Sequence, residues 1–409
     1  MVLVTSHPVP KGPMFKPAFR FVPVVLTLSL VAGSGCRQPT RAASRHEASR
    51  ARASRPASAM ASNELTDTAR LLAGMTPDAS SPLAAIAAKP AWQEWHQEFD
   101  TQWAQATTER FADMKAWRDR ELAPATGDCS TLMYPFSGPD ILNAFLLFPD
   151  CRRYVLFGLE PIGSLPPVER LSSERLTRLF EETRHALNDL LSRNYFITSH
   201  MLEDTAAAEL RGTLPLMAVS LVRLDARIVS VRDLEIAPDG QLRPRSAPSK
   251  DKRAASAIEI VFERPGREPQ TLVYFRAQAQ DAALPQHPGV VPFLEHEAPF
   301  ATFLKSASYL LHGRDFSVVR GVLLHGSRLV LEDDSGVPLR FFKAPEWTLT
   351  FFGKYDKPIK DFNYGYQPDM AAAYADRRNV KPLTFSFGYH WADGAASVLL
   401  AVRNPQPAH

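Results

Sequence analysis

The segment 129–166 constrains the fold more than any other part of this chain. Residues 131–136 are apolar and aromatic, and the turn sequence Ser-Gly-Pro-Asp at 137–140 ends them. Residues 141–148 are densely apolar, as in a short buried helix, and 153–159 have the composition of a second strand. The connection is too long for a tight hairpin and long enough for a parallel crossover, which should be right-handed. The sequence therefore predicts a βαβ unit.

Two cysteines support the parallel arrangement. Cys129 and Cys151 each stand two residues ahead of a predicted strand. Neighbouring parallel strands would place both at the same edge of the sheet, whereas antiparallel strands would place them at opposite ends. A disulfide needs Cα atoms about 4.4–6.8 Å apart, which is roughly the spacing of neighbouring strands. We therefore predict a Cys129–Cys151 disulfide that stabilises the fold by about 3 kcal/mol.

The N-terminus has the pattern of an export signal. Three basic residues precede the apolar run 21–32, which is too short to span a membrane and ends in Gly33-Ser34-Gly35-Cys36. This arrangement resembles a bacterial lipoprotein signal, with Cys36 as the residue that is lipidated after cleavage. It departs from that family at Gly33, where Leu or Val is usual, and secretion with cleavage nearby is the alternative. Met14 would be a more typical start, which would leave residues 1–13 untranslated.

The resemblance implies a location and a membrane partner. Arg37, rather than an aspartate, follows Cys36, which in Gram-negative lipoproteins implies an outer-membrane anchor facing the periplasm. With Cys36 lipidated, Cys129 and Cys151 remain as an even pair, which suits an oxidising compartment. The rest of the chain is not recognised as a member of any family.

Charge is unevenly distributed along the chain. Residues 1–60 carry nine Lys or Arg and one acidic residue, so the remainder has 38 basic and 43 acidic residues. The folded part therefore has a net charge of −5 and lacks the basic character of a nucleic-acid-binding protein. Hydrophobic content of 45% and charged content of 22% are globular values.

We predict a mixed α/β fold: a βαβ-containing sheet flanked by helices, with additional antiparallel hairpins and a helical N-terminal segment. Apolar periodicity predicts amphipathic helices over 90–122 and 168–193, and 258–263 with 271–276 predict a hairpin. The C-terminal third suggests helices at 300–312, 316–325 and 369–376, and strands at 328–332, 347–352, 383–389 and 397–402. The expected divisions are a signal peptide (1–35), a disordered basic tether (36–62), a helical segment packed on the core (63–124), two parts of the α/β core (125–236 and 257–409) and an intervening linker or long loop (237–256).

Acidic residues follow three predicted strands: Asp140, Glu160, and the pair Asp333 and Asp334. If these strands share a sheet and a direction, the carboxylates converge on one edge, where open α/β sheets bind ligands. Such carboxylates could bind Ca²⁺ or Mg²⁺, or serve as acid and base in glycoside cleavage. Taken singly, each is also an ordinary turn, cap or solvated loop residue.

The turn at 137–140 has the same two interpretations. Ser137 and Gly138 lie where a ligand would bind at the strand end. Alternatively, Ser137 caps the following helix, Pro139 is its first residue and Asp140 faces its dipole.

The sequence lacks the motifs of several common catalytic and cofactor-binding sites. There is no H-E-x-x-H, no G-x-S-x-G and no G-x-G-x-x-G, so we expect no zinc, no serine hydrolase elbow and no resident cofactor. Residues 132–160 do resemble a nucleotide-binding βαβ unit, with Glu160 where an acid would hold a ribose, but the loop has a single glycine. This predicts a Rossmann-like shape without the cofactor.

These observations favour an exported, lipid-anchored envelope protein that binds a ligand or partner, such as a cell-wall glycan or another envelope protein. The alternative is a hydrolase, acting on glycans, that uses Asp140, Glu160 and Asp333 or Asp334.

Overall fold

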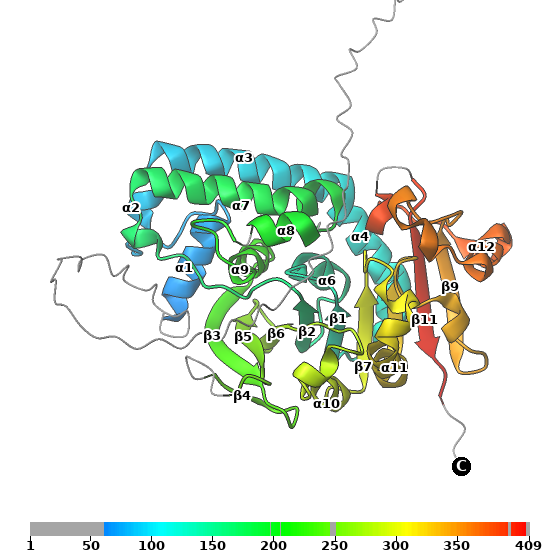
Figure 1. Cartoon of the computed structure of the whole chain (residues 1–409). Helices are drawn as coiled ribbons and strands as arrows, with labels where there is room; N and C mark the ends of the chain where they lie inside the picture. The colour runs from blue at the N-terminus through cyan, green and yellow to red at the C-terminus, as the bar shows by residue number, and fades with distance from the viewer. Residues whose placement is uncertain (1–60, 197, 205, 246–250, 392–393, 406–409) are drawn as a thin grey trace, which may run out of the picture. The chain divides into compact units, whose positions relative to one another are not determined.

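The computed structural model describes residues 61–196, 198–204, 206–245, 251–391 and 394–405 (Figure 1). The predicted signal peptide, Cys36 and nearly all of the predicted tether lie outside these residues. Within the described ranges, none of the helices combines the length and the apolar character that a membrane span requires.

The centre of the fold is one mixed sheet, which confirms the predicted mixed α/β class. Eleven strands of the described chain stand in the order β10-β9-β11-β8-β7-β1-β2-β6-β5-β3-β4. Their bounds are β1 (Thr131–Pro135), β2 (Arg153–Gly158), β3 (Arg227–Ile236), β4 (Leu242–Pro244), β5 (Ala255–Glu263), β6 (Gln270–Arg276), β7 (Phe300–Leu304), β8 (Ser327–Glu332), β9 (Trp347–Gly353), β10 (Val380–Lys381) and β11 (Ser397–Arg403). The predicted hairpin corresponds to β5 and β6, which pair antiparallel.

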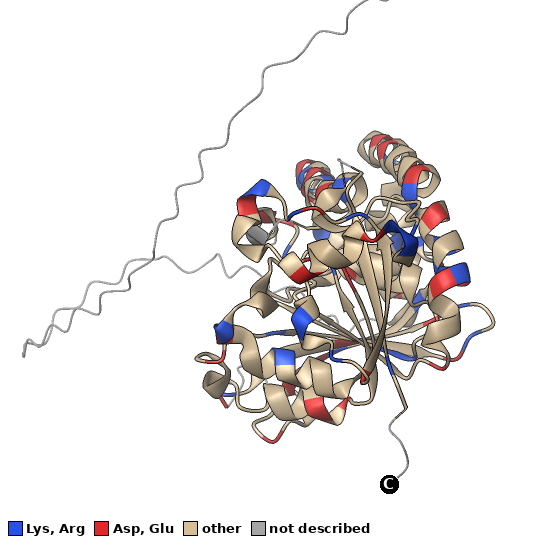
Figure 2. Ribbon diagram, turned by 90° about the vertical axis from the view of Figure 1, so that its right-hand side faces the viewer, with Lys and Arg blue, Asp and Glu red and all other residues tan. Residues whose placement is uncertain are grey.

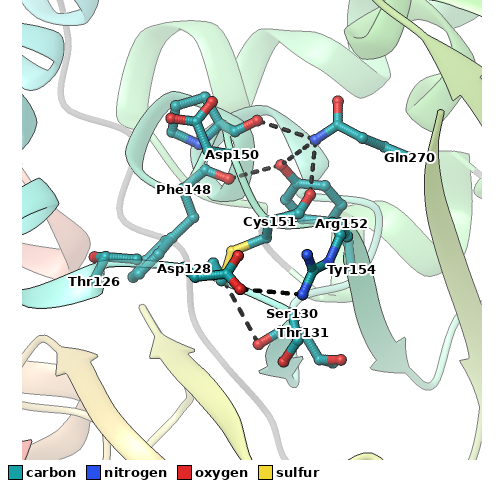
Figure 3. The surroundings of a disulfide bond; sticks show 12 residues. Thr126, Asp128, Ser130, Thr131, Phe148, Asp150, Cys151, Arg152, Tyr154 and Gln270 are labelled. Carbon is teal, nitrogen blue, oxygen red and sulfur yellow. Dashed lines mark hydrogen bonds and ion pairs between the residues drawn. A yellow bond between two sulfur atoms is a disulfide. The ribbon is translucent and has the colours of Figure 1, made fainter. Parts of the chain in front are cut away.

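The predicted βαβ unit is present. Strands β1 and β2 pair in parallel, with Thr131 opposite Arg153, and α6 (Ile141–Leu147) connects them. Cys129 and Cys151 form a disulfide ahead of the two strands, with Cα atoms 4.4 Å apart (Figure 3). Beside the bridge, Gln270 Nε2 donates to the carbonyl oxygen of Cys151 at 2.7 Å, which links the disulfide to β6.

The parallel strands have a doubly wound order. Strands β8, β7, β1, β2 and β6 are parallel neighbours, and β9 runs in the same direction because both β8 and β9 pair antiparallel with β11. Numbered along the chain, these six strands stand in the order 3-2-1-4-5-6, with β11 inserted before the last. Successive connections therefore reverse direction between β1 and β7, and ligands in such sheets bind outside the carboxyl ends of the strands at this switch point.

Helices cover both faces of the sheet (Figures 1 and 2). Side chains alternate along each strand: Leu132 and Tyr134 join a larger core with α1, α3, α6, α7 and α9, whereas Met133 and Val155 join a second core with α10 and α11. The helices not yet given are α1 (Ser62–Leu72), α2 (Ala84–Ala87), α3 (Pro90–Ala106), α4 (Ala112–Trp117), α5 (Ala123–Thr126), α7 (Ser173–Arg193), α8 (Thr198–Asp204), α9 (Leu214–Arg223), α10 (Val290–His296), α11 (Ser317–Gly326) and α12 (Pro368–Ala375). Shorter π-helical segments at Thr107–Phe111 and Arg118–Leu122 join α3, α4 and α5 into one continuous helical stretch, as predicted for 90–122.

Two predicted elements are wrong. Residues 300–312 do not form a helix: 300–304 are β7, and 3-10 turns follow at Leu310–His312 and Arg314–Phe316. All five residues of β7 are buried, and a short apolar run of this kind has no periodicity that separates strand from helix. Residues 383–389 do not form a strand, and the chain there leads into a 3-10 turn at Gly388–His390. Within the expected linker 237–256, β4 and the first residues of β5 belong to the sheet.

The disulfide gives a first testable prediction. Replacing both Cys129 and Cys151 by Ser should lower the free energy of unfolding by about 3 kcal/mol, because the bridge closes a loop with a sequence separation of 22. Urea unfolding of the parent and the double variant measures this difference. A non-reducing peptide map that recovers Cys129 and Cys151 as two free thiols would contradict the bridge itself.

Candidate functional site

Charged side chains gather at the carboxyl ends of β1, β7 and β8. Asp140 follows β1, Lys305 follows β7, Glu332 ends β8, and Asp333 and Asp334 come directly after it. We call these five residues the strand-end cluster. Each is only 2–3% exposed. Because the three strands are parallel neighbours at the switch point, the topology alone brings these residues to one edge of the sheet.

An enclosed ion pair forms one half of the cluster. Lys305 Nζ lies 2.9 Å from Asp140 Oδ2, and the Tyr134 hydroxyl donates to the same oxygen at 2.9 Å. Asp140 Oδ1 accepts from the backbone N–H of Asn143 at 3.1 Å, so Asp140 is the N-cap of α6. Lys305 also donates to the carbonyl oxygen of Asn194 at the end of α7. Asp140 thus has the structural role that a carboxylate at a helix N-terminus commonly has, and Ser137 is not the cap.

Three consecutive acids form the other half. Glu332 Oε2 accepts from the Val337 N–H at 2.8 Å, and Asp333 Oδ2 accepts from the Ser306 N–H at 2.8 Å. Asp334 accepts from the Tyr309 hydroxyl. Burial raises the pKa of all three carboxyl groups. The neighbouring charge of Asp333 raises the pKa of Asp334 further, to about 7, whereas Lys305 opposes the rise at Asp333.

The backbone beside the cluster adopts unfavourable conformations. Ser306, Ser308 and Tyr309 have φ of +53°, +52° and +54°, and Phe136 after β1 has φ of +58°. Residues other than glycine adopt this left-handed backbone conformation at a cost on the order of 1–3 kcal/mol each. Such residues are concentrated at functional sites. The four residues follow β1 and β7, the two strands that flank the switch point.

Aromatic rings cover the acidic half. The Tyr309 ring centroid lies 5.2 Å from that of Phe362 and 6.1 Å from that of Tyr389, with which it stacks. The Tyr389 hydroxyl donates to the carbonyl oxygen of Ser306 at 2.9 Å. Tyr364 contacts Tyr309 and Phe362 but is itself 71% exposed. We call Tyr309, Phe362, Tyr364 and Tyr389 the aromatic cover.

Glu160 belongs to a separate hydrogen-bonded set. It follows β2, is 5% exposed, and accepts from the Tyr274 hydroxyl at 3.3 Å. Burial raises the pKa of its carboxyl group. It packs against the 137–140 turn: a Cβ on Gly138 would lie 3.6 Å from Glu160 Oε2. Ser137 is 6% exposed, so this turn is closed by its own neighbours.

The structure therefore pairs Asp140 with Lys305 and places Asp333 and Asp334 at the same edge of the sheet, and it places Glu160 beside Ser137 and Gly138. The carboxylates are not arranged as a metal site: the described residues hold no group of three His, Cys, Asp or Glu side chains placed to bind a metal ion. Their oxygens instead accept hydrogen bonds from backbone N–H and tyrosine hydroxyl groups.

A dinucleotide, the ligand that this sheet order suggests, does not fit the loop after β1. In dinucleotide-binding folds the pyrophosphate lies at the N-terminus of the first helix, against a glycine-rich turn. Here the Asp140 carboxylate occupies the N-terminus of α6 and is paired with Lys305. A bound phosphate would compete with this buried carboxylate, so the Rossmann-like sheet order is not accompanied by its phosphate site.

Sequence reasoning missed Lys305, Glu332 and Tyr309. Lys305 and Tyr309 fall within 300–312, which the sequence suggests is helical, so neither is predicted to stand at a strand end. Lys305 directly follows an apolar run. If that run is assigned as a strand, Lys305 is predicted at its carboxyl end. Comparisons of this chain with family models, with curated proteins and with solved structures found no match.

Proposed function

We propose that this protein is an exported, lipid-anchored protein of the cell envelope that binds a ligand at the carboxyl edge of its sheet. One observation carries the binding part of the proposal: four acids and a lysine are buried together at the switch point of a doubly wound sheet. Burying more acidic than basic side chains lowers the free energy of unfolding, so such a cluster is expected where function requires it.

The surroundings of the cluster favour a glycan as the ligand. Sugars present hydroxyl groups that donate to carboxylates and apolar ring faces that stack on aromatic side chains. The strand-end cluster offers the first kind of contact, and the aromatic cover offers the second. Because the acids are about 2% exposed, binding requires the cover to move away from Asp334. Tyr364, the most exposed ring of the cover, is the first that a ligand would meet.

The envelope location rests on the lipoprotein-like signal that ends at Cys36, and the disulfide supports it. A Cys129–Cys151 bridge is stable in an oxidising compartment such as the periplasm and is rare in the cytosol. Lipidation of Cys36 would attach the protein to the membrane.

Thermal melts test the binding proposal. In the full chain carrying Cys36→Ser, a cell-wall sugar should raise the melting temperature, because ligand at a hundredfold excess over its Kd stabilises by about 2.7 kcal/mol. Tyr364→Ala and Asp334→Asn should each remove most of the shift. Glu268→Gln, in the exposed turn between β5 and β6 at the opposite edge, should retain it. A sugar panel that shifts none of the four proteins would contradict the proposal.

A second candidate, glycoside hydrolysis, is favoured by the raised pKa of Asp334. A carboxyl group whose pKa is about 7 is protonated often enough near neutral pH to act as a general acid. Asp333 or Asp140 would then act as base or nucleophile. Release of new reducing ends from peptidoglycan, abolished by Asp334→Asn, would identify the hydrolase. Sugar binding without release of reducing ends would favour the first candidate, a sugar-binding protein without hydrolase activity.

A further inference from the structure

A hollow of about 690 Å³ lies beside the disulfide, at the amino ends of β1 and β2. Cys129 and Cys151 are part of its wall, so it is at the opposite edge of the sheet from the strand-end cluster. We call it the disulfide hollow. Arg118, Arg264 and Arg267 are among the residues that line it. Its volume is within the range of about 300–1,000 Å³ that small-molecule sites occupy.

Two of the arginines are held in place by the fold. Arg264 lies over the Phe145 ring at 4.3 Å and donates to Gln270 Oε1 at 3.0 Å and to the carbonyl oxygen of Pro149. Arg118 donates to the carbonyl oxygen of Leu146 at 3.0 Å. Their side chains are only 15% and 17% exposed. A pair of positioned guanidinium groups provides directed donors, and little conformational entropy remains to be lost on binding.

Positive charge exceeds negative charge around the hollow. Its lining holds five basic residues (Lys115, Arg118, Arg223, Arg264 and Arg267) and three acidic ones (Asp119, Asp150 and Asp225). Burial lowers the pKa of Arg264, and the positive charges of Arg267 and Arg118 lower it further, so both of these arginines repel Arg264. An anion placed among them would relieve this repulsion.

The carboxylates that now face these arginines are weak competitors. Asp150 lies 2.9 Å from Arg267 and 3.9 Å from Arg264, and Asp119 pairs with Arg118 at 2.6 Å. Their side chains are 55% and 64% exposed. The Arg267–Asp150 pair is exposed on both sides, and pairs of this kind contribute about 0.2–1 kcal/mol, so a ligand can displace Asp150 at small cost.

We propose that the disulfide hollow binds the phosphate group of an anionic ligand. Each carboxylate pairs mainly with one arginine, whereas a phosphate dianion has three terminal oxygens and can accept from several guanidinium groups at once. The hollow exceeds the size of a phosphate ion, and Trp103, Phe111 and Phe145 also line it. The ligand therefore carries an organic body beside its phosphate, as a soluble phosphate ester or a phospholipid headgroup does.

Calorimetry and vesicle sedimentation with the full chain carrying Cys36→Ser distinguish the two sources. The soluble probe is glycerol 3-phosphate, and the lipid probe is vesicles of phosphatidylglycerol with phosphatidylcholine. Binding of either probe by the parent, with a Kd that Arg267→Gln and Arg118→Gln each weaken about tenfold or more, supports the proposal. Arg267 has a side chain 54% exposed, so its replacement should leave the fold intact.

Arg243→Gln is the matched control, because Arg243 is an exposed arginine on β4 that pairs with a nearby aspartate and lies outside the hollow. It should bind like the parent. Loss of soluble-probe binding in the variants assigns a phosphate ester, and loss of vesicle binding alone assigns a lipid phosphate. Two results would overturn the proposal: no binding of either probe by the parent, or equal binding by the parent, the two hollow variants and Arg243→Gln.

Discussion

The free energy of unfolding should fall by on the order of 3 kcal/mol as the pH rises from 5 to 8, which is the contribution of the two pH units between 5 and the folded pKa of Asp334. Burial raises the folded-state pKa of Glu332, Asp333 and Asp334 above their unfolded values, so the folded protein binds more protons than the unfolded chain in this range. The free energy that these groups contribute to stability is fully present below their unfolded-state pKa. It is lost as the pH rises through their folded-state pKa. For Asp334 this window runs from 3.8 to about 7, and each unit corresponds to about 1.4 kcal/mol.

Glu332→Gln isolates the contribution of one acid. Glutamine keeps an oxygen that accepts from the Val337 N–H, but it carries no charge at any pH. The variant should be more stable than the parent at pH 8 and should lose less stability between pH 5 and 8. Lys305, whose pKa burial lowers, acts in the opposite direction, and it is present in both proteins. Urea unfolding at several pH values measures the difference, with the exposed Glu268→Gln as control. Equal pH profiles for parent and Glu332→Gln would contradict the prediction.

The sequence was sufficient for the central βαβ unit because local signals there agree. An apolar strand, a turn of Ser, Gly, Pro and Asp, and a second strand at parallel-crossover distance lead to one arrangement, and the cysteines confirm its direction. The convergence of Asp140 with Asp333 and Asp334 was also predictable, because parallel strands bring their carboxyl ends to one edge.

The partners of these acids were not predictable from the sequence. Lys305 pairs with Asp140 across a sequence separation of 165, and no local pattern signals such a contact. Tyr309 donates to Asp334 from a segment after β7 in which the backbone takes left-handed conformations. Residues other than glycine rarely adopt these conformations, so the sequence does not predict them there. Burial also reverses the expected character of the carboxylates: acids in turn sequences suggest solvated groups, yet these are enclosed by the fold.

The two ends of the sheet have opposite electrostatic character. At the carboxyl edge, four acids and one lysine are buried, and the aromatic cover begins at Tyr309, which donates to Asp334. At the amino edge, arginines line a hollow beside the disulfide. The proposals for the two edges are therefore independent, since variants at one edge leave the charges of the other unchanged.

Breaking the Asp140–Lys305 pair should destabilise the protein by on the order of 3–5 kcal/mol. Lys305→Met leaves the buried Asp140 carboxylate without its cation, and removal of one partner of a buried pair carries this cost. Asp140→Asn keeps one oxygen that accepts from the Asn143 N–H, so the cap of α6 is preserved, because Asn is also a favoured N-cap residue. The oxygen that accepts from the Tyr134 hydroxyl is replaced by an NH2 group, which can donate to the Tyr134 oxygen instead. The double variant Asp140→Asn, Lys305→Met should lose less stability than the sum of the two single losses.

Urea unfolding of the four proteins gives the coupling free energy, which we expect to reach about 1–3 kcal/mol. The exposed pair Arg184–Glu98, at 3.1 Å between α7 and α3, is the control and should give a coupling of about 0.2–1 kcal/mol. A large coupling at Asp140 would mean that this carboxylate is committed to its lysine, which leaves Asp333 as the base of the alternative hydrolase mechanism. If Lys305→Met instead costs no more than the control substitutions, water reaches Asp140, and the cluster is more open than its burial indicates.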